Sequence, residues 1–224
     1  MRSILLFPAD RRRSFVDALA CGAEAILLRP DDAANMTRDE ALTWARGLIA
    51  AARGRERPKL FVEIASLRAG GPDELAALVI PGLDGVVLQG CEGRADVQQL
   101  SLRLGAAEAA ADLPAGAVRI VALAAQTPAA VFALGGYAGA SARLTALAMD
   151  ETALPGGAAA RAAARTLLAL GAAAAGALAL DICPPAKGNA LEEACRAIRR
   201  EGFSGLVTAA AGEIPAINRA FGAI

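Results

Sequence analysis

RSILLFPADRRRSFVDALACGAEAILL, residues 2–28, contains one complete strand–helix–strand unit and decides the fold. Ser3–Pro8 and Ala25–Arg29 are near-continuous apolar runs, as expected of parallel strands that are buried on both faces. Between them Arg12–Cys21 is predicted to be a helix, and Gly22 follows it where a glycine commonly ends a helix. The segment therefore predicts a βαβ unit with parallel strands.

The same alternation continues along the chain and predicts eight strands, the number that closes a barrel filled with side chains. The further strands are expected at Lys59–Ile64, Gly85–Gln89, Arg119–Ala124, Leu144–Met149, Ala177–Ile182 and Gly205–Thr208. The further helices are expected at Arg38–Arg53, Pro72–Val79, Ala95–Ala111, Pro128–Leu134, Ala158–Ala174, Ala190–Glu201 and Ile214–Phe221. The sequence therefore predicts an α/β fold, a (β/α)8 TIM barrel, formed by residues 1–224 as a single domain.

An open, doubly wound sheet is the alternative architecture for such an alternation. It usually carries a glycine-rich phosphate loop after the first strand, whereas here that loop reads PADRRR, without glycine. Thr37 and Glu40 have the spacing of a capping box at the start of a helix, and Asp73 and Glu74 place acidic side chains in the first turn of the next helix. The barrel is therefore favoured.

Composition excludes several classes of function. The 23 basic and 23 acidic residues balance, so nucleic-acid binding is not expected. The chain has no histidine, which excludes Ser-His-Asp hydrolysis, Cys-His proteolysis and the common histidine-containing zinc sites. No run reaches the roughly 20 strongly apolar residues that span a bilayer, so no membrane association is expected. The scattered cysteines and the lack of a signal peptide indicate a cytoplasmic protein with reduced thiols.

In TIM barrels the active site lies at the C-terminal ends of the strands. That rule selects the polar residues that follow the predicted strands: Asp10, Arg11, Arg29, Asp31, Asp32, Glu63, Cys91, Glu92, Gln126, Asp150, Glu151, Asp181 and Lys187. Lys59 begins its strand and is expected at the opposite end, which leaves Lys187 as the amine that could form an imine. Asp181 is expected to satisfy backbone donors in the turn after its strand.

Three blocks of the chain resemble a known family. They are residues 2–28, GLDGVVLQGCEGRADV at residues 82–97, and GFSGLVTAAAGEIPAINRAF at residues 202–221. In this register the chain is similar to citrate lyase beta chains of the HpcH/HpaI aldolase and citrate lyase superfamily. The resemblance implies a TIM barrel of the phosphoenolpyruvate/pyruvate-domain type, usually a trimer or hexamer. It also implies Mg²⁺-dependent carbon–carbon cleavage beside a thioester or carboxylate, through an enolate whose oxyanion the metal stabilises.

The resemblance assigns substrate-binding positions to Arg11, Arg29, Asp31, Asp32 and Glu63. Arg29 replaces the first aspartate of the family's DLED motif, and Asp31 and Asp32 replace its glutamate and last aspartate. Glu63 stands where the family has an arginine that grips an anionic substrate, which reverses the charge. Arg29 and Glu63 could therefore form a salt bridge across the pocket. Arg11 begins an arginine run that either grips a phosphate or CoA or is a solvated surface.

The resemblance also implies a metal site at Gln126, Asp150 and Glu151. Gln126 replaces a glutamate, and its neutral amide is a poorer Mg²⁺ ligand than a carboxylate. Asp150 and Glu151 could equally begin a helix with acidic side chains and bind no ion. Mg²⁺ is the expected cofactor, with weak affinity, and a protein without a cofactor is the alternative.

Two functional hypotheses follow. The first is a carbon–carbon lyase of the citrate lyase beta type, acting on a small carboxylate or acyl-CoA, with a degenerate site and reduced or altered activity. The second is a non-catalytic barrel that binds a ligand or pairs with an active paralogue. No residue is assigned a catalytic role, and whether the protein is an enzyme stays open. The family resemblance and the Ala/Gly-rich helices further predict a homotrimer or another homo-oligomer.

Overall fold

Eight parallel strands form a closed barrel in the order β1 to β8 in the computed structural model, which describes residues 1–9, 14–30, 36–54, 56–150, 152–182 and 189–222. The strands are β1 (Ser3–Pro8), β2 (Ala25–Arg29), β3 (Lys59–Ile64), β4 (Gly85–Leu88), β5 (Arg119–Leu123), β6 (Leu144–Asp150), β7 (Leu178–Ile182) and β8 (Gly205–Thr208). The barrel closes because β8 pairs with β1, with Ile4 opposite Val207. The predicted barrel is therefore confirmed, and the open sheet is excluded.

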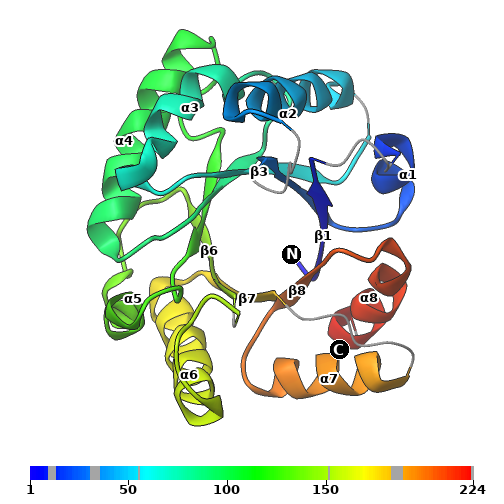
Figure 1. Ribbon diagram of the computed structural model, residues 1–224, viewed down its shortest axis with the longest axis vertical. Coiled ribbons are helices and arrows are strands. Elements are labelled where there is room, and N and C mark those ends of the chain that lie inside the picture. Colours follow the sequence, from blue (N-terminus) through cyan, green and yellow to red (C-terminus); the bar gives the residue numbers. More distant parts are fainter. Residues whose placement is uncertain (10–13, 31–35, 55, 151, 183–188, 223–224) are drawn as a thin grey trace.

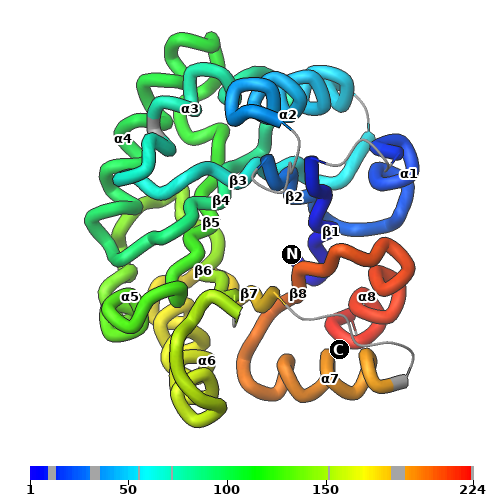
Figure 2. Tube along the Cα trace, viewed as in Figure 1, coloured from blue at the N-terminus to red at the C-terminus, as the bar shows by residue number. Residues whose placement is uncertain are grey.

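Helices surround the strands as an outer ring (Figure 1). The trace in Figure 2 follows one strand after the next around the barrel inside that ring. The helices are α1 (Phe15–Ala20), α2 (Arg38–Ala52), α3 (Gly71–Leu78), α4 (Arg94–Ala110), α5 (Pro128–Phe132), α6 (Ala158–Ala175), α7 (Asn189–Arg200) and α8 (Ile214–Gly222). Short 3-10 turns lie at η2 (Leu67–Ala69), η3 (Leu134–Gly136) and η4 (Ala211–Glu213). No helix in the described ranges is long and apolar enough to cross a membrane.

Some helix boundaries differ from those that the sequence predicts. The first helix was expected from Arg12 but begins at Phe15, because the Ser14 side chain accepts a hydrogen bond from the Asp17 amide at 3.3 Å and caps it there. The helix expected to reach Leu134 ends at Phe132, where the chain tightens into the 3-10 turn η3.

The capping box of α2 is confirmed. The Thr37 hydroxyl accepts from the Glu40 amide at 3.3 Å, and the Glu40 carboxylate accepts from the Thr37 amide at 2.7 Å. Asp73 and Glu74 lie in the first turn of α3 as predicted, and Glu74 is also bound by Arg38 of α2 at 2.6 Å. This ion pair ties the start of α2 to the start of α3.

The strands separate two apolar cores, because successive side chains point to opposite faces. One core fills the barrel and includes Leu27, Phe61 and Val87, while the other packs the outer faces of the strands against the helices. The Phe61 ring can lie over its partner Gly85 on the neighbouring strand β4, because Gly85 has no side chain and a Cβ there would collide with the ring. The barrel is thus filled, and ligand sites are restricted to its two ends.

Candidate functional site

Three polar side chains from neighbouring strands meet in the C-terminal mouth of the barrel, the end where the strands finish. Arg29, Glu63 and Gln89 each stand two residues beyond a member of the interior core, and so point inward. They come from β2, from β3 and from the residue that follows β4, which are neighbours in the barrel. The strand alternation thus brings together residues that lie far apart in the sequence.

These three side chains form a hydrogen-bonded network around Glu63. Arg29 Nε donates to Glu63 Oε2 at 3.2 Å, and Gln89 Nε2 donates to Glu63 Oε1. The Glu63 side chain is only 2% exposed and that of Arg29 17%, so the pair is largely removed from water. A buried carboxylate is tolerated only when it is paired and hydrogen-bonded, as here. The predicted Arg29–Glu63 salt bridge is therefore confirmed, whereas the part played by Gln89 was missed.

The residues expected to hold a metal are bound to other partners. Gln126 Oε1 accepts a hydrogen bond from the Gly90 amide at 2.6 Å, so the amide joins the segments that follow β4 and β5. Asp150 points into the mouth from β6, but its Oδ1 accepts from the Thr152 amide at 2.9 Å and from the Thr152 hydroxyl. Glu151 lies outside the described residues.

The oxygen-bearing side chains of the described residues do not form a site that fits a magnesium ion. Mg²⁺ needs oxygen ligands in near-octahedral geometry, and anionic oxygens bind it best. Gln126 is neutral and already accepts a hydrogen bond, and Glu63 is shared between Arg29 and Gln89. Across the described part of the chain, no three His, Cys, Asp or Glu residues gather closely enough to hold a metal ion.

Several predicted site residues cannot be placed in this mouth. Asp181 was expected there but points outward, because its neighbours Leu180 and Ile182 face the barrel interior. It forms an ion pair with Arg165 of α6 at 2.5 Å, and the Arg165 guanidinium lies 4.6 Å from the centre of the Phe203 ring. Five further candidates fall outside the described residues: Asp10, Arg11, Asp31, Asp32 and Lys187.

Cys91 and Glu92, which follow β4, have structural partners. Burial raises the pKa of the Cys91 thiol to about 11, and its Sγ lies 3.3 Å from the Tyr137 hydroxyl. A thiol with a raised pKa is a poor nucleophile, because the thiolate is the reactive form. Glu92 pairs with Arg68 at 2.9 Å, and the Arg68 side chain is 82% exposed. Neither residue contributes a catalytic group on this geometry.

The fold defines the class of the protein: a (β/α)8 TIM barrel, with polar side chains at its C-terminal mouth. No protein-family model and no curated protein matches the chain. Solved structures do match it. RipC from Yersinia pestis has a TM-score of 0.75 at 21% identity, and the match covers 98% of this chain and 94% of that one.

Two further solved structures have the same architecture. The citrate lyase beta subunit of Mycobacterium tuberculosis, complexed with oxaloacetate and magnesium, has a TM-score of 0.73 at 22% identity, covering 98% of this chain and 96% of that one. Malate synthase of Haloferax volcanii, in a pyruvate/acetyl-CoA ternary complex, has a TM-score of 0.79 at 16% identity, covering 98% and 69%. These likenesses confirm the fold that the sequence resemblance implied.

Proposed function

We propose that the chain is a divergent member of the citrate lyase beta group of the HpcH/HpaI superfamily, with reduced or altered carbon–carbon lyase activity. Three sequence blocks that resemble this family, and the fold shared with the M. tuberculosis citrate lyase beta subunit, support the proposal. Its ligand would be a small carboxylate or an acyl-CoA. Solved relatives hold oxaloacetate, acetoacetate and coenzyme A.

The Arg29–Glu63–Gln89 network is the main observation that supports the proposal of reduced activity. Arg29 is a cation suited to a substrate carboxylate, but Glu63 already neutralises it at 3.2 Å. An entering carboxylate would have to displace Glu63 and would meet its negative charge. The neutral Gln126 weakens metal binding in addition. Each defect should cost about 2–4 kcal/mol of transition-state stabilisation, comparable to the loss of one oxyanion donor, and together they remove several decades of rate.

The test combines an activity assay with a binding measurement. With Mg²⁺ or Mn²⁺ present, cleavage of malyl- and citramalyl-type thioesters should be slow or absent. The Glu63→Gln variant should bind oxaloacetate about tenfold more tightly by calorimetry, because Arg29 is released and one negative charge is lost. Glu92→Gln removes a carboxylate from the exposed Arg68 pair and should leave the affinity unchanged.

Robust turnover by the unaltered protein would overturn the proposal. Tight metal binding that Glu63→Gln abolishes would also overturn it, since Glu63 would then be a replacement ligand.

The second candidate function is a non-catalytic barrel that binds a ligand or pairs with an active paralogue. The Arg29–Glu63 ion pair at the mouth favours this candidate, because two charges that neutralise each other can shape a pocket without taking part in chemistry. Oxaloacetate binding without any thioester turnover, in both the unaltered protein and the Glu63→Gln variant, would select this candidate over the lyase.

We also propose that the protein assembles as a homo-oligomer, with a trimer expected from the family resemblance. Large apolar side chains exposed on neighbouring helices support this assembly. Phe132 of α5 is 88% exposed, and Leu170 of α6 is 64% exposed. Contact with another copy of the chain would remove these apolar side chains from water, which favours association.

A further inference from the structure

The N-terminal mouth of the barrel, the end where the strands begin, contains a hollow. Its volume is about 500 Å³, which is in the range of small-molecule sites. Phe61, Leu144 and Leu178 supply apolar surface, and Lys59, Arg119 and Thr145 supply polar groups. An apolar surface with a few polar groups is the usual composition of a ligand pocket. No residue of the C-terminal mouth takes part in it.

The two cations point into this hollow because of the strand alternation. Phe61 and Val121 belong to the interior core. Lys59 lies two residues before Phe61 on β3, and Arg119 lies two residues before Val121 on β5, so both cations face the same way as these core residues. Only β4 separates the two strands, so their backbones lie about 10 Å apart, and both long side chains can reach one ligand. Gly85 of β4 adds no side chain between them, and the Phe61 ring covers it.

The charge balance at this end leaves the two cations available. Asp84, an acidic residue of the lining, accepts from Arg57 at 2.5 Å and from the Leu60 amide at 2.7 Å. Within the described residues, neither Lys59 nor Arg119 forms an ion pair. The hollow therefore carries a net positive charge that its own acidic groups do not cancel.

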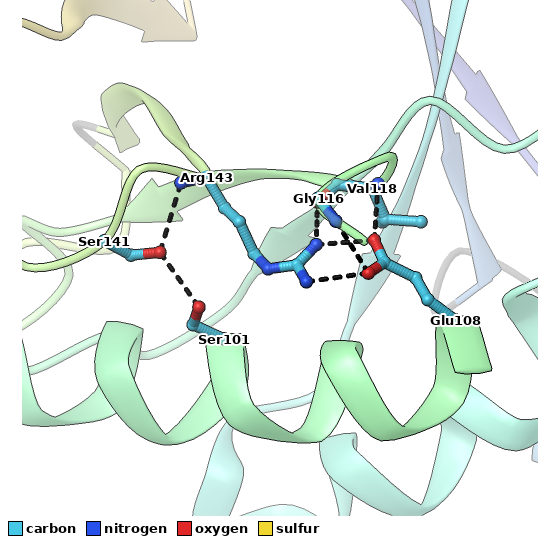
Figure 3. Close-up of polar contacts among 6 residues, drawn as sticks. All are labelled: Ser101, Glu108, Gly116, Val118, Ser141 and Arg143. Atoms are coloured by element: carbon cyan, nitrogen blue, oxygen red, sulfur yellow. Dashed lines mark hydrogen bonds and ion pairs between the residues drawn. The ribbon is translucent and has the colours of Figure 1, made fainter. Parts of the chain in front are cut away.

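Two ion pairs hold the rim of the hollow in place. On one side Arg57 joins Asp84 and donates to the Gly82 carbonyl at 2.6 Å, which fixes the starts of β3 and β4. On the other side Glu108 of α4 binds Arg143 and the amides of Gly116 and Val118, as Figure 3 shows. Val118 immediately precedes Arg119, so this network fixes the backbone that presents the arginine. Such support from neighbouring residues is what makes a binding site preorganised.

We propose that the N-terminal mouth binds a phosphate monoester with an apolar organic group. Arginine binds phosphate through its planar fork of donors, and lysine binds it as a point charge, so the pair suits a dianionic phosphate. The organic group would lie on Phe61, Leu144 and Leu178. This site is at the opposite end of the barrel from the proposed lyase site and does not depend on the chemistry there.

The proposal is tested by titrating the full chain with phenyl phosphate and with inorganic phosphate. Phenyl phosphate should bind several-fold more tightly, because only its ring can bury apolar surface on Phe61. Lys59→Gln and Arg119→Gln should each weaken phenyl phosphate binding about tenfold by calorimetry, the loss expected for one charge-assisted hydrogen bond. Arg103→Gln on α4 removes an equal charge from an exposed position outside the hollow, and should leave binding unchanged.

Amide chemical shifts of the unaltered protein give a second measurement that needs no variant. Phenyl phosphate should shift the Gly85 and Gly176 amides at the N-terminal mouth, but not the Gly90 amide at the other end. Equal affinities of the Lys59→Gln, Arg119→Gln and Arg103→Gln variants would overturn the proposal. Shifts at Gly90 without shifts at Gly85 and Gly176 would also overturn it, because the ligand would then occupy the C-terminal mouth.

Discussion

Glu108 of α4 is a carboxylate that is only 1% exposed, yet it carries its charge inside the protein. Arg143 binds it through both terminal nitrogens, at 2.5 and 2.7 Å, and the Gly116 and Val118 amides donate at 2.9 and 2.8 Å. Burial alone would raise the pKa of Glu108, but these donors outweigh it and hold the pKa below its usual value of 4.5. The folded state therefore binds this proton less readily than the unfolded chain does.

The first prediction concerns this carboxylate. Glu108→Gln should lower the free energy of unfolding at pH 7 by about 3 kcal/mol, because it leaves the Arg143 charge buried without its partner. Since the folded pKa is depressed, the contribution of Glu108 is present above the unfolded pKa and is lost as pH falls through the folded pKa. The difference between the two proteins in urea unfolding should thus shrink from pH 7 to pH 3. Glu92→Gln, from an exposed pair, should change stability by less than about 1 kcal/mol. A constant difference across this pH range would contradict the prediction.

Residues were predictable where strand order alone sets their neighbours. Arg29 is the last residue of β2 and Glu63 the last but one of the adjacent β3, so their contact follows from the alternation. The prediction that Asp181 lies at the mouth was wrong, because its side chain points outward to Arg165 on a helix. A shift of one position along the strand decides whether a side chain faces the mouth or the helices. The Gly90 bond of Gln126 was also unpredictable, because it depends on the path of two loops.

At the scale of elements, α6 packs closely against the turn η3 at Gly171. Gly171 makes this approach possible, because a Cβ at this position would collide with the backbone carbonyl of Leu134. The exposed Gly47 in α2 has no atom within 4 Å of such a Cβ. The two helical glycines therefore differ in what they do: one sets a packing distance, and the other only loosens its helix.

The second prediction compares these glycines. Gly171→Ala should lower the free energy of unfolding by about 1–3 kcal/mol, because α6 must move away from Leu134. Gly47→Ala should raise it by about 0.5–1 kcal/mol, because alanine is the better helix former and meets no obstacle. Urea unfolding of both variants measures the contrast. Stabilisation by both substitutions would show that α6 can shift without cost.

Apolar periodicity predicted the existence and the order of the elements, but it predicted the residues at which they end less accurately. All eight predicted strands are present, yet β4 ends at Leu88 and not at Gln89, and β5 ends at Leu123 and not at Ala124. Periodicity reports which residues are buried, whereas an element ends where its ladder or helical bonds stop. The 3-10 turn after Phe132 has no apolar signature that distinguishes it from the end of an α-helix.

At the scale of the whole molecule, α5 and α6, the helices that carry the exposed Phe132 and Leu170, are neighbours in the outer ring (Figure 1). The third prediction is that light scattering gives a mass that is a multiple of the 22.6 kDa chain. Phe132→Asp should reduce that mass, because a charge cannot be buried unpaired in an interface. Val16→Asp on α1, whose side chain is 66% exposed elsewhere on the ring, is the matched control and should leave the mass unchanged. A mass near 22.6 kDa across a concentration series would refute assembly.

Closure of the barrel has a consequence for synthesis on the ribosome. β1 pairs with β8 through Ser3 opposite Leu206, so the last partner of the first strand is made some two hundred residues later. At the usual translation rates this takes on the order of 10–40 s. Until then the apolar β1 keeps one edge of backbone donors and acceptors unpaired, which is the kind of edge that recruits other chains. The nascent chain therefore carries an aggregation-prone edge for the whole interval between the synthesis of β1 and that of β8.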